Sequence, residues 1–478
     1  MFCNMNKEYT ILHISDLHKS DEDSYDDLFE SMRKDSETYV QQGISLPEII
    51  VVSGDIVEGA KDDDKTPDDT IRKQYADAKV FLTALCDYFL GGEKRRLILV
   101  PGNHDLNRPF SKNVLVPSPK DRKTDYQKYK AGEQNLRWSW EDFAFQIIPD
   151  RNLYEKRFNH YVDFYNDFYE GSRLTHEDNA LHGDVIDLPD YNMSFLTLNS
   201  CHNLDRYNDA GSIFTGAVSE NGIRLGELDR KGRLLCGVWH HHISGLPTEH
   251  NYMDYRILST MMRYNIQVGL FGHQHKAKVV QQYHDVTEEK EMLLISSGCL
   301  YGNAKQLTPS SSRQYNLISI TMKDDKAEIE IRTRMDESEG QYQYPSWGEG
   351  HPGNTKKTVI RKIIPLPKPD ESLTNLINEV DVWARTSEDY KAGLEKMVAL
   401  RGTNDIVERY IDEYLEKMKP EDIGFVLDVI KEPLTEKQAM YLLGSAQTLR
   451  NKTLLSSLRQ MDFIKQCNSP MVKVLRDE

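Results

Sequence analysis

The sequence predicts an α/β domain that contains an inserted segment and is followed by an all-helical C-terminal domain. Short apolar runs alternate with helical patterns from residue 9 to about residue 336, which is typical of layered α/β domains. The interval 106–191 interrupts this alternation, and the residues from 371 onward have helical periodicity without strand signals. The 478 residues are enough for two or three domains, at roughly 150 residues each.

Seven short apolar runs are expected to form buried strands. Each holds four to six residues, is rich in Val, Ile and Leu, and ends abruptly in polar or Gly-rich residues. In chain order they are Tyr9–Ile14, Ile49–Val52, Leu97–Val100, Phe195–Leu198, Leu234–Trp239, Gln267–Phe271 and Met292–Ile295. Helical patterns occur at Tyr25–Val40 and Ile71–Leu90, and two strand-like runs after Tyr315 are joined by a turn at 323–326. This domain is expected to span residues 1–338.

Three further segments are distinguished by their composition. The interval 106–191 is polar and aromatic, with helix-like stretches at Trp138–Ile148 and Tyr154–Tyr169, and we interpret it as a cap-like insertion beside the strand ends. Residues 339–370 are rich in Gly and Pro, which is the composition of a linker. Residues 371–478 are expected to form a helical domain, because apolar residues recur there at spacings of three and four. We expect this domain to serve partner binding or oligomerisation.

The charge and cysteine content limit the classes of partner. Lys and Arg number 60 and Asp and Glu 76, so the net charge is −16. Such a surface repels nucleic acid and anionic membranes on average, and a polyanionic substrate would need a local basic patch. The six cysteines are scattered, which is typical of a reducing compartment. The sequence has no signal-peptide pattern and no run of roughly 18 apolar residues, so we expect a cytoplasmic protein without a membrane partner.

Asp, Asn and His side chains follow five of the predicted strands at the points where they end. In an α/β sheet, ligands gather outside the carboxyl ends of the strands. Carboxylate, amide oxygen and imidazole together suit divalent metals such as Mn, Fe, Zn or Co. No Cys stands among these strand-end residues, which argues against a structural zinc site. Seven ligands are too many for one ion and suit two ions that share a bridging ligand. The seven are Asp16, His18, Asp55, Asn103, His240, His273 and His275.

These residues also stand in a known order of motifs. The order is D-x-H, G-D, G-N-H-(D/E), a lone His and G-H-x-H, at Asp16/His18, Gly54/Asp55, Gly102–Asp105, His240 and Gly272–His275. Over roughly residues 9–335 the sequence resembles the calcineurin-like metallophosphoesterase superfamily, which includes double-strand-break repair nucleases and cyclic-nucleotide phosphodiesterases. The resemblance implies a four-layer α-β-β-α sandwich core and two divalent metal ions, with manganese expected first and iron, zinc, cobalt or nickel as alternatives.

The resemblance also implies the role of each ligand. One metal would be held by Asp16, His18, Asp55 and His275. The other would be held by Asp55, Asn103, His240 and His273, so that Asp55 bridges the pair.

Further catalytic residues are carried over in the same way. His104 is expected to protonate the leaving oxygen or to stabilise the transition state, and Glu58 to orient His104. The run His240-His241-His242 leaves open whether His240 or His241 is the ligand; we favour His240 and expect His242 to face substrate.

Each of these residues alone has a simpler explanation. A strand-end Asp is often a helix cap or turn former, and a lone His is often a surface residue. Capping does not require His at four separate places, so together the residues favour a metal centre. Asn199 and His202, after another strand, would approach substrate or form a turn.

A basic and aromatic segment directly follows the G-N-H-D motif. Residues 108–137 hold eight Lys or Arg and three acids, a net charge of +5, with Tyr126, Tyr129, Trp138 and Trp140 interleaved or close by. Positive charge and aromatic rings are what single-stranded nucleic acid binds. The alternative is a solvated loop that balances the acidic residues 62–64. The candidate substrate-binding residues are Arg108, Lys120, Arg122 and Lys123.

Three functions are compatible with these features. The first is two-metal hydrolysis of phosphate esters by a metal-bound hydroxide, most simply by a phosphodiesterase acting on nucleotides or nucleic acid, including a nuclease. The second is a phosphomonoesterase acting on a phosphoprotein or small metabolite. The third is a binding or regulatory module in which the metals only stabilise structure. By analogy with nucleases of this superfamily, the helical domain would bind a partner ATPase or self-associate.

Overall fold

A computed structural model describes residues 8–19, 24–131, 133–173, 181–214, 216–243, 252–254, 256–285, 290–301, 307, 312–323, 325–338, 344–352, 357–366, 377, 380–381, 384–385, 387, 389–402 and 406–477. The chain divides into two compact units, Met1–Pro369 and Asp370–Glu478. Each unit is described separately below.

Two large sheets form the centre of the first unit. In the described residues the first sheet has the order β15-β14-β13-β1-β2-β3, with β16 also paired to β14, and the second has the order β11-β12-β10-β9-β8-β7. The first contains β1 (Glu8–Ile14), β2 (Ile49–Val52), β3 (Leu97–Leu99), β13 (Gln314–Met322), β14 (Lys326–Asp336), β15 (Trp347–Glu349) and β16 (Val359–Pro365). The second contains β7 (Gly183–Leu188), β8 (Met193–Leu198), β9 (Leu234–Val238), β10 (Val268–Phe271), β11 (Lys278–Asp285) and β12 (Lys290–Ser296).

The predicted strands are confirmed, and buried β-branched residues explain them. β2 is Ile-Ile-Val-Val and fully buried, as expected of a strand covered on both faces. β1, β2 and β3 are parallel neighbours, and so are β8, β9, β10 and β12. β13 and β14 form the predicted antiparallel hairpin. Two strands were not predicted: β7, which pairs with β8, and β11, which pairs with β12.

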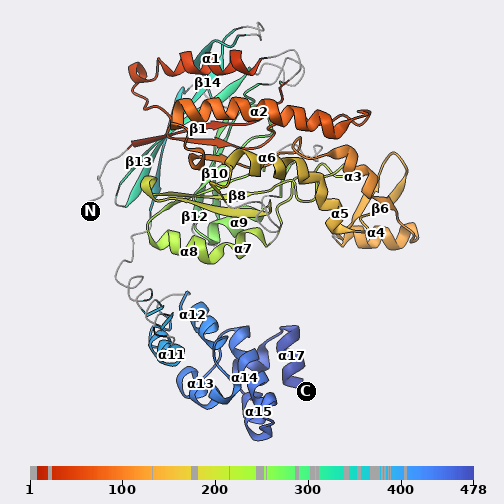
Figure 1. The fold of residues 1–478 in the computed structure, drawn as a ribbon, viewed down its shortest axis with the longest axis vertical. Coiled ribbons are helices and arrows are strands. Elements are labelled where there is room, and N and C mark those ends of the chain that lie inside the picture. The colour runs from red at the N-terminus through yellow and green to blue at the C-terminus, as the bar shows by residue number, and fades with distance from the viewer. Residues whose placement is uncertain are drawn as a thin grey trace. The chain divides into compact units, whose positions relative to one another are not determined.

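Helices cover the outer faces of both sheets and complete the four layers (Figure 1). α1 (Tyr25–Ser36), α2 (Pro67–Leu90) and α6 (Asn159–Tyr169) pack on the first sheet. α7 (Ala217–Glu220), α8 (Gly222–Arg230) and α9 (Arg256–Arg263) pack on the second. A third apolar core lies between the two sheets and includes Ile11, Val51, Phe195 and Leu270. The predicted α-β-β-α sandwich is therefore confirmed.

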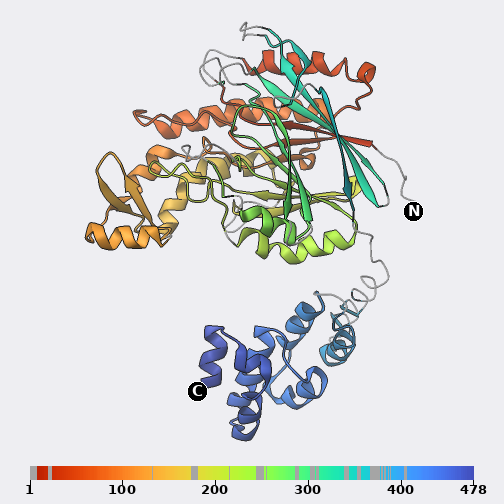
Figure 2. The ribbon, with the colours of Figure 1, turned by 180° about the vertical axis from the view of Figure 1, so that it is seen from behind.

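The inserted segment differs from its prediction in one part. The expected helix at Trp138–Ile148 is wrong, because β5 (Leu136–Ser139) and β6 (Ala144–Ile147) pair as an antiparallel hairpin there. β4 (Val116–Pro117) joins them in a small sheet beside α3 (Arg108–Val114), α4 (Arg122–Lys130) and α5 (Arg151–Glu155). Figure 2 shows this small sheet and α4 extending from the side of the sandwich. The helical prediction for Tyr154–Tyr169 is confirmed by α5, α6 and the short 3-10 turn between them.

Part of the segment predicted as a linker belongs to the first sheet. β15 and β16 both pair with β14, β16 over seven residue pairs from Lys326↔Pro365 to Arg332↔Val359. Pro365 lies at the end of β16, which among the described residues pairs with β14, and proline is tolerated on such an edge strand. The prediction of a continuous linker over 339–370 is therefore wrong for 347–349 and 359–365.

The second unit has a helical core of its own, as predicted. Its helices bury apolar residues such as Val407, Ile411, Leu442 and Leu443 against one another. They are α11 (Tyr390–Val398), α12 (Ile406–Leu415), α13 (Ile423–Ile430), α14 (Glu436–Thr448), α15 (Lys452–Leu458), α16 (Asp462–Gln466) and α17 (Pro470–Asp477). Among the described residues, no helix has both the length and the apolar character needed to cross a membrane.

Candidate metal centre

The loops after β1, β2, β3, β9 and β10 carry the seven predicted ligands. Five of these ligands have φ angles in the left-handed region that non-Gly residues rarely adopt. The angles are 54° for Asp16, 31° for His18, 53° for Asp55, 78° for His273 and 52° for His275. Such conformations cost roughly 1–3 kcal/mol each and cluster at functional sites. The backbone is therefore held in an unfavourable form where it presents these side chains.

The first group of ligand atoms surrounds Asp16. His18 Nε2 lies 3.6 Å and His275 Nε2 lies 3.4 Å from Asp16 Oδ1. The two imidazole nitrogens lie 3.2 Å from each other. Asp16 and His18 are buried, and His275 is partly exposed, so the group opens to solvent on one side.

The second group surrounds Asn103. Its Oδ1 lies 3.0 Å from His240 Nε2 and 2.9 Å from His273 Nδ1. The two ring nitrogens are 3.2 Å apart. The structure thus brings the predicted ligands together in the two groups that the motifs imply, with His240 as the nearest member of the histidine run.

Asp55 joins the two groups through one oxygen. Its Oδ2 lies 3.3 Å from His18 Nε2 and 3.1 Å from His240 Nε2. In both groups, imidazole nitrogens from two histidines lie close to one oxygen atom. Two lone pairs and an oxygen repel one another unless a proton or a cation lies between these atoms. Carboxylate, amide oxygen and imidazole are donors for divalent cations, so this donor set fits a divalent metal site with Asp55 Oδ2 positioned to bridge.

Buried charges in the centre stabilise one another. Burial alone would raise the pKa of Asp16, but hydrogen bonds with His18 and His275 hold it well below its usual range. The pKa of Asp55 is also lowered, against the effect of burial, chiefly by His240. Burial opposes charge on His240 as well, yet the carboxylate of Asp55 raises its pKa to about 9. A bound cation would replace the extra proton on the His240 ring, because an imidazole binds a metal only in its neutral form.

His104 faces the same cluster, but its partner differs from the prediction. His104 Nδ1 lies 2.7 Å from the backbone oxygen of Glu58, so the expectation that the Glu58 side chain orients the ring is corrected. The loop comes this close because Gly59, at φ +79°, has no Cβ; one would lie 2.8 Å from the His104 carbonyl oxygen. A carbonyl only accepts, so Nδ1 donates its proton and Nε2 is the reactive nitrogen. Burial lowers the pKa of His104 to about 4.

Asp105 was part of the motif but had no predicted role. Its carboxylate accepts hydrogen bonds from the backbone N–H groups of Ile56 (3.1 Å) and Gly102 (2.7 Å) and from the Tyr75 hydroxyl (3.1 Å). Burial, together with the charge of Asp55, raises its pKa to about 7. Asp105 thus ties the loop after β2 to the loop after β3, and its place in the G-N-H-D block is the signal that could have identified it.

Two glycines explain why the motifs contain glycine beside the ligands. A Cβ at Gly54 would lie 2.6 Å from His240 Nδ1, and the residue has φ +94°. A Cβ at Gly102 would collide with the carboxylate of Asp55. The ligands can approach so closely only because these two side chains are absent.

The other histidines of the run lie outside the ligand cluster. His241 is fully buried, its Nδ1 lies 2.9 Å from Ser200 Oγ, and its ring centroid is 4.6 Å from that of His273. It therefore packs behind the ligands, held by a serine that sequence analysis did not identify. His242 is 4% exposed and packs edge-on against Phe271 at 5.1 Å. A role for His242 in substrate binding stays a prediction.

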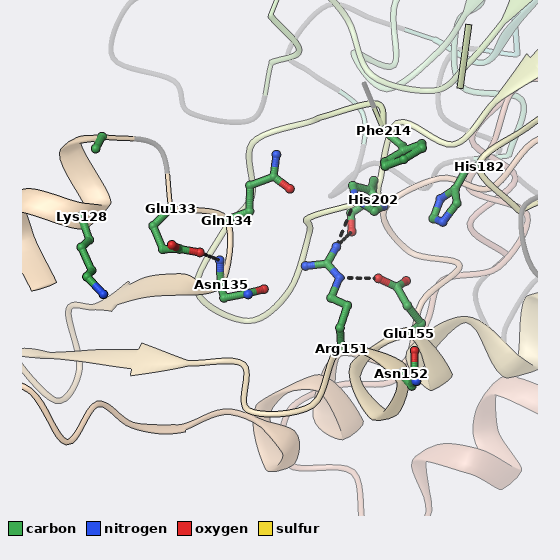
Figure 3. A pocket seen from close by; sticks show the side chains of 11 residues that line it. Lys128, Glu133, Gln134, Asn135, Arg151, Asn152, Glu155, His182, His202 and Phe214 are labelled. Carbon is green, nitrogen blue, oxygen red and sulfur yellow. Dashed lines mark hydrogen bonds and ion pairs between the residues drawn. The ribbon is translucent and has the colours of Figure 1, made fainter. Parts of the chain in front are cut away.

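A cavity of about 740 Å³ lies beside the loop after β8. In Figure 3, Arg151 points toward His202, and Phe214 and His182 lie on the same side. Arg151 Nη2 lies 3.1 Å from His202 Nε2. His202 is two residues from Ser200, the serine that holds His241, so the Cα atoms of His202 and Ser200 are at most roughly 7 Å apart. Asn199 has the predicted turn role, since its Oδ1 accepts from the N–H of Cys201 (2.8 Å).

The predicted basic residues lie on the inserted segment. Arg108 begins α3 and pairs with Asp209 at 3.2 Å. The guanidinium of Arg122 stacks over Trp138 at 4.8 Å. Lys120 and Lys123 are exposed at the start of α4. Contact between these four residues and substrate stays a prediction.

This chain is similar to one known protein family and, at low identity, to several solved structures. A family model described as calcineurin-like phosphoesterase matches residues 9–277. A dimetal phosphatase from Danio rerio is 12% identical, with TM-score 0.35, over 67% of this chain and 95% of that chain. Vps29 from Entamoeba histolytica, complexed with zinc, is 10% identical, with TM-score 0.25, over 74% and 98%. GAP50, the anchor in the inner membrane complex of Plasmodium, is 11% identical, with TM-score 0.30, over 73% and 90%. No curated protein matches.

Proposed function

Because the chain belongs to the calcineurin-like phosphoesterase family, we propose that it hydrolyses phosphodiesters of nucleotides or nucleic acid with two divalent cations. The observation that carries this proposal is the shared position of Asp55 Oδ2, within 3.3 Å of a ligand nitrogen from each group. Two cations bound there would polarise the phosphoryl oxygens and lower the pKa of a bound water. Manganese is the first metal we would test.

His104 is the protein group best placed to handle a proton. Its Nδ1 is fixed on the Glu58 carbonyl, and its backbone N–H donates to Asp55 Oδ1 at 2.8 Å, so the ring has one orientation. With its pKa lowered to about 4, the ring is neutral at pH 7. A phosphate group beside Nε2 would favour the protonated ring, because an opposite charge stabilises the charged form. His104 would then donate that proton to the leaving oxygen.

The diester preference is supported by the inserted segment and not by the ligands. A diester has substituents on both sides of the phosphorus, so its enzyme needs surface beyond the metals. The basic segment begins three residues after Asp105, and the cavity lined by Arg151 and His202 adjoins the loop that holds His241.

The test uses chelator-stripped protein to which Mn²⁺ is added back. We expect hydrolysis of bis-p-nitrophenyl phosphate to exceed that of p-nitrophenyl phosphate. Asp55→Asn removes the bridging charge and should lower kcat by about 10³-fold or more, and His104→Asn by about 10²–10⁴-fold. Asp167→Asn is the matched control, because Asp167 is exposed and pairs only with Lys79 among its described contacts.

Two results would contradict the proposal in different ways. Wild-type rates in both Asp55→Asn and His104→Asn would remove the assignment of the centre. Faster hydrolysis of the monoester would leave the centre in place and favour a phosphomonoesterase.

A further inference from the structure

An exposed group of aromatic rings lies at the tip of the β5–β6 hairpin. We call residues 136–147 the aromatic hairpin. Trp140 is 75% exposed and Phe143 is 65% exposed in the turn. Their ring centroids lie 6.2 Å apart, and that of Trp140 lies 5.7 Å from Trp138, all in edge-to-face arrangements that leave ring faces open to solvent. Large exposed aromatic surfaces mark interaction sites.

The turn that presents these rings is ordered by its own hydrogen bonds. Ser139 Oγ donates to Asp142 Oδ2 at 2.8 Å and accepts from the Asp142 N–H at 3.0 Å. Gln146 Nε2 donates to the same carboxylate oxygen at 3.1 Å. Asp142 is therefore used within the hairpin, and Phe143 follows it at φ +50°. Trp140 and Phe143 are exposed from a fixed backbone, which lowers the entropy cost of binding.

A buried ion pair anchors the aromatic hairpin to the sandwich. Arg137 Nε lies 2.6 Å from Asp205 Oδ2, and the Tyr154 hydroxyl donates to the same oxygen at 2.7 Å. Arg137 is 5% exposed and Asp205 is fully buried. Arg122 of α4 stacks over Trp138 at 4.8 Å, and the Tyr129 ring lies 5.6 Å from that of Phe145. The hairpin is thus a firmly held part of the first unit.

Positive charge without ion-pair partners among the described residues lies on and before α4, the helix that packs on the hairpin. Among the described residues, five cations on and before α4 form no ion pair: Lys120, Arg122, Lys123, Lys128 and Lys130. The ammonium of Lys128 lowers the pKa of Lys120, which shows that the two like charges lie close together.

Two acids of this region, Glu141 and Asp121, are engaged by groups other than the cations of α4. Glu141, at the tip, lies 3.8 Å from Lys112 and 3.9 Å from Arg206. Asp121 caps α4 by accepting from the backbone N–H groups of Lys123 and Thr124. Asp125 and Glu133 act on Lys120 through their charge, but neither forms an ion pair with it among the described contacts, so the cations of α4 can bind an external polyanion.

The same segment lines part of the cavity beside the loop after β8. Lys128 and Asn135 line one side of it, and Arg151 and His202 line the other (Figure 3). A chain lying on the hairpin and crossing this cavity would come to the loop that holds His241.

We propose that the aromatic hairpin and the cations of α4 bind single-stranded nucleic acid, with bases stacked on Trp140 and Phe143 and phosphates beside the lysines. Single strands are specified because paired bases in a duplex already stack on each other and offer no free faces. This inference rests on the proposed function, since it names the substrate class that the centre would cut.

The test measures binding of fluorescein-labelled oligothymidine to the full chain by fluorescence anisotropy, in EDTA so that no cleavage occurs. Stacking of each base contributes about 1–3 kcal/mol, so W140A/F143A should weaken binding by roughly tenfold or more. Trp140→Phe keeps a ring and should retain most of the affinity. Val40→Ala, which truncates a side chain 77% exposed far along the sequence, should bind like wild type.

Three results would overturn this inference. The first is W140A/F143A binding as tightly as wild type. The second is absence of oligothymidine binding by a wild-type chain that hydrolyses bis-p-nitrophenyl phosphate; that result would leave the proposed function standing. The third is light scattering that shows a wild-type oligomer and a monomeric W140A/F143A, which would make the hairpin a self-association surface. Thermal unfolding of each variant distinguishes lost binding from lost folding.

Discussion

The two carboxylate oxygens of Asp55 have different neighbours. Oδ2 faces the ring nitrogens of His18 and His240, and Oδ1 accepts the backbone N–H of His104 at 2.8 Å. One residue therefore joins the two ligand groups and also fixes the loop that carries His104. A neutral isostere at this position keeps the second contact and loses the first.

Glu58 gives a prediction at the scale of single residues. Its backbone oxygen bonds to His104, so the carboxylate is dispensable and Glu58→Ala should keep kcat for bis-p-nitrophenyl phosphate within about twofold of wild type. Steady-state rates with Mn²⁺ measure this, with His104→Asn as the inactive reference. A loss in Glu58→Ala as large as in His104→Asn would mean that the side chain acts after all.

His202 gives a prediction for stability against pH. Burial, aided by the charge of Arg151, lowers its pKa from 6.5 to about 3. The folded pKa lies below the unfolded one, so the unfolded chain gains a proton first as the pH falls, and stability is lost below about pH 6.5. Between about pH 8 and about pH 5 the wild type should lose about 2 kcal/mol more unfolding free energy than His202→Gln. Urea titrations at both pH values measure it; equal losses would contradict it.

The residues of the centre were predictable to different degrees. All seven ligands stand in the motifs because each must follow a strand end directly. Asp105 stands in the G-N-H-D motif, but its hydrogen bonds to backbone N–H groups appear only in the structure. Ser200 stands in no motif, and no spacing in the sequence encodes its contact with His241. The Glu58 contact was misassigned because sequence shows side chains, whereas the contact is made by the backbone.

At the scale of elements, long buried strands were predictable and short mixed ones were not. β1, β2 and β9 are apolar runs with abrupt ends, which only a covered strand explains. β5 and β6 are four residues each, and their aromatic residues Trp138 and Phe145 are seven apart, which also matches helical spacing. Their pairing is stabilised by contacts with residues outside this segment: Phe145 packs against Tyr129 of α4, and Arg137 pairs with Asp205. β16 was not predicted, because the prolines at and after its end are typical of a linker.

The anchor of the aromatic hairpin gives the prediction at this scale. Arg137→Met leaves Asp205 buried without its partner, which should cost about 3–5 kcal/mol of unfolding free energy. Arg224→Met is the matched control, because the Arg224–Asp184 pair is half exposed at 3.5 Å and should contribute less than about 1 kcal/mol. Chemical denaturation measures both. Similar small losses in the two variants would show that the hairpin is held by other contacts.

At the scale of the whole molecule, the chain has two units with separate cores. Calorimetry of the full chain should therefore show two unfolding transitions. The seven proposed metal ligands all lie in the unit of residues 1–369. Mn²⁺ should therefore raise the temperature of one transition, because at a hundredfold excess over its Kd it adds about 2.7 kcal/mol to the unfolding free energy of that unit. Leu442→Ala, in the buried core of the other unit, should lower only the second transition. A single transition that shifts as a whole would contradict this division.

The central claim is that two cations share Asp55, and anomalous scattering from crystals grown with Mn²⁺ tests it most directly. We expect two anomalous peaks about 3.5–4 Å apart, with Asp55 Oδ2 between them. The first should be bound by Asp16, His18 and His275 and the second by Asn103, His240 and His273. A single peak, or peaks that do not involve Asp55, would contradict the account.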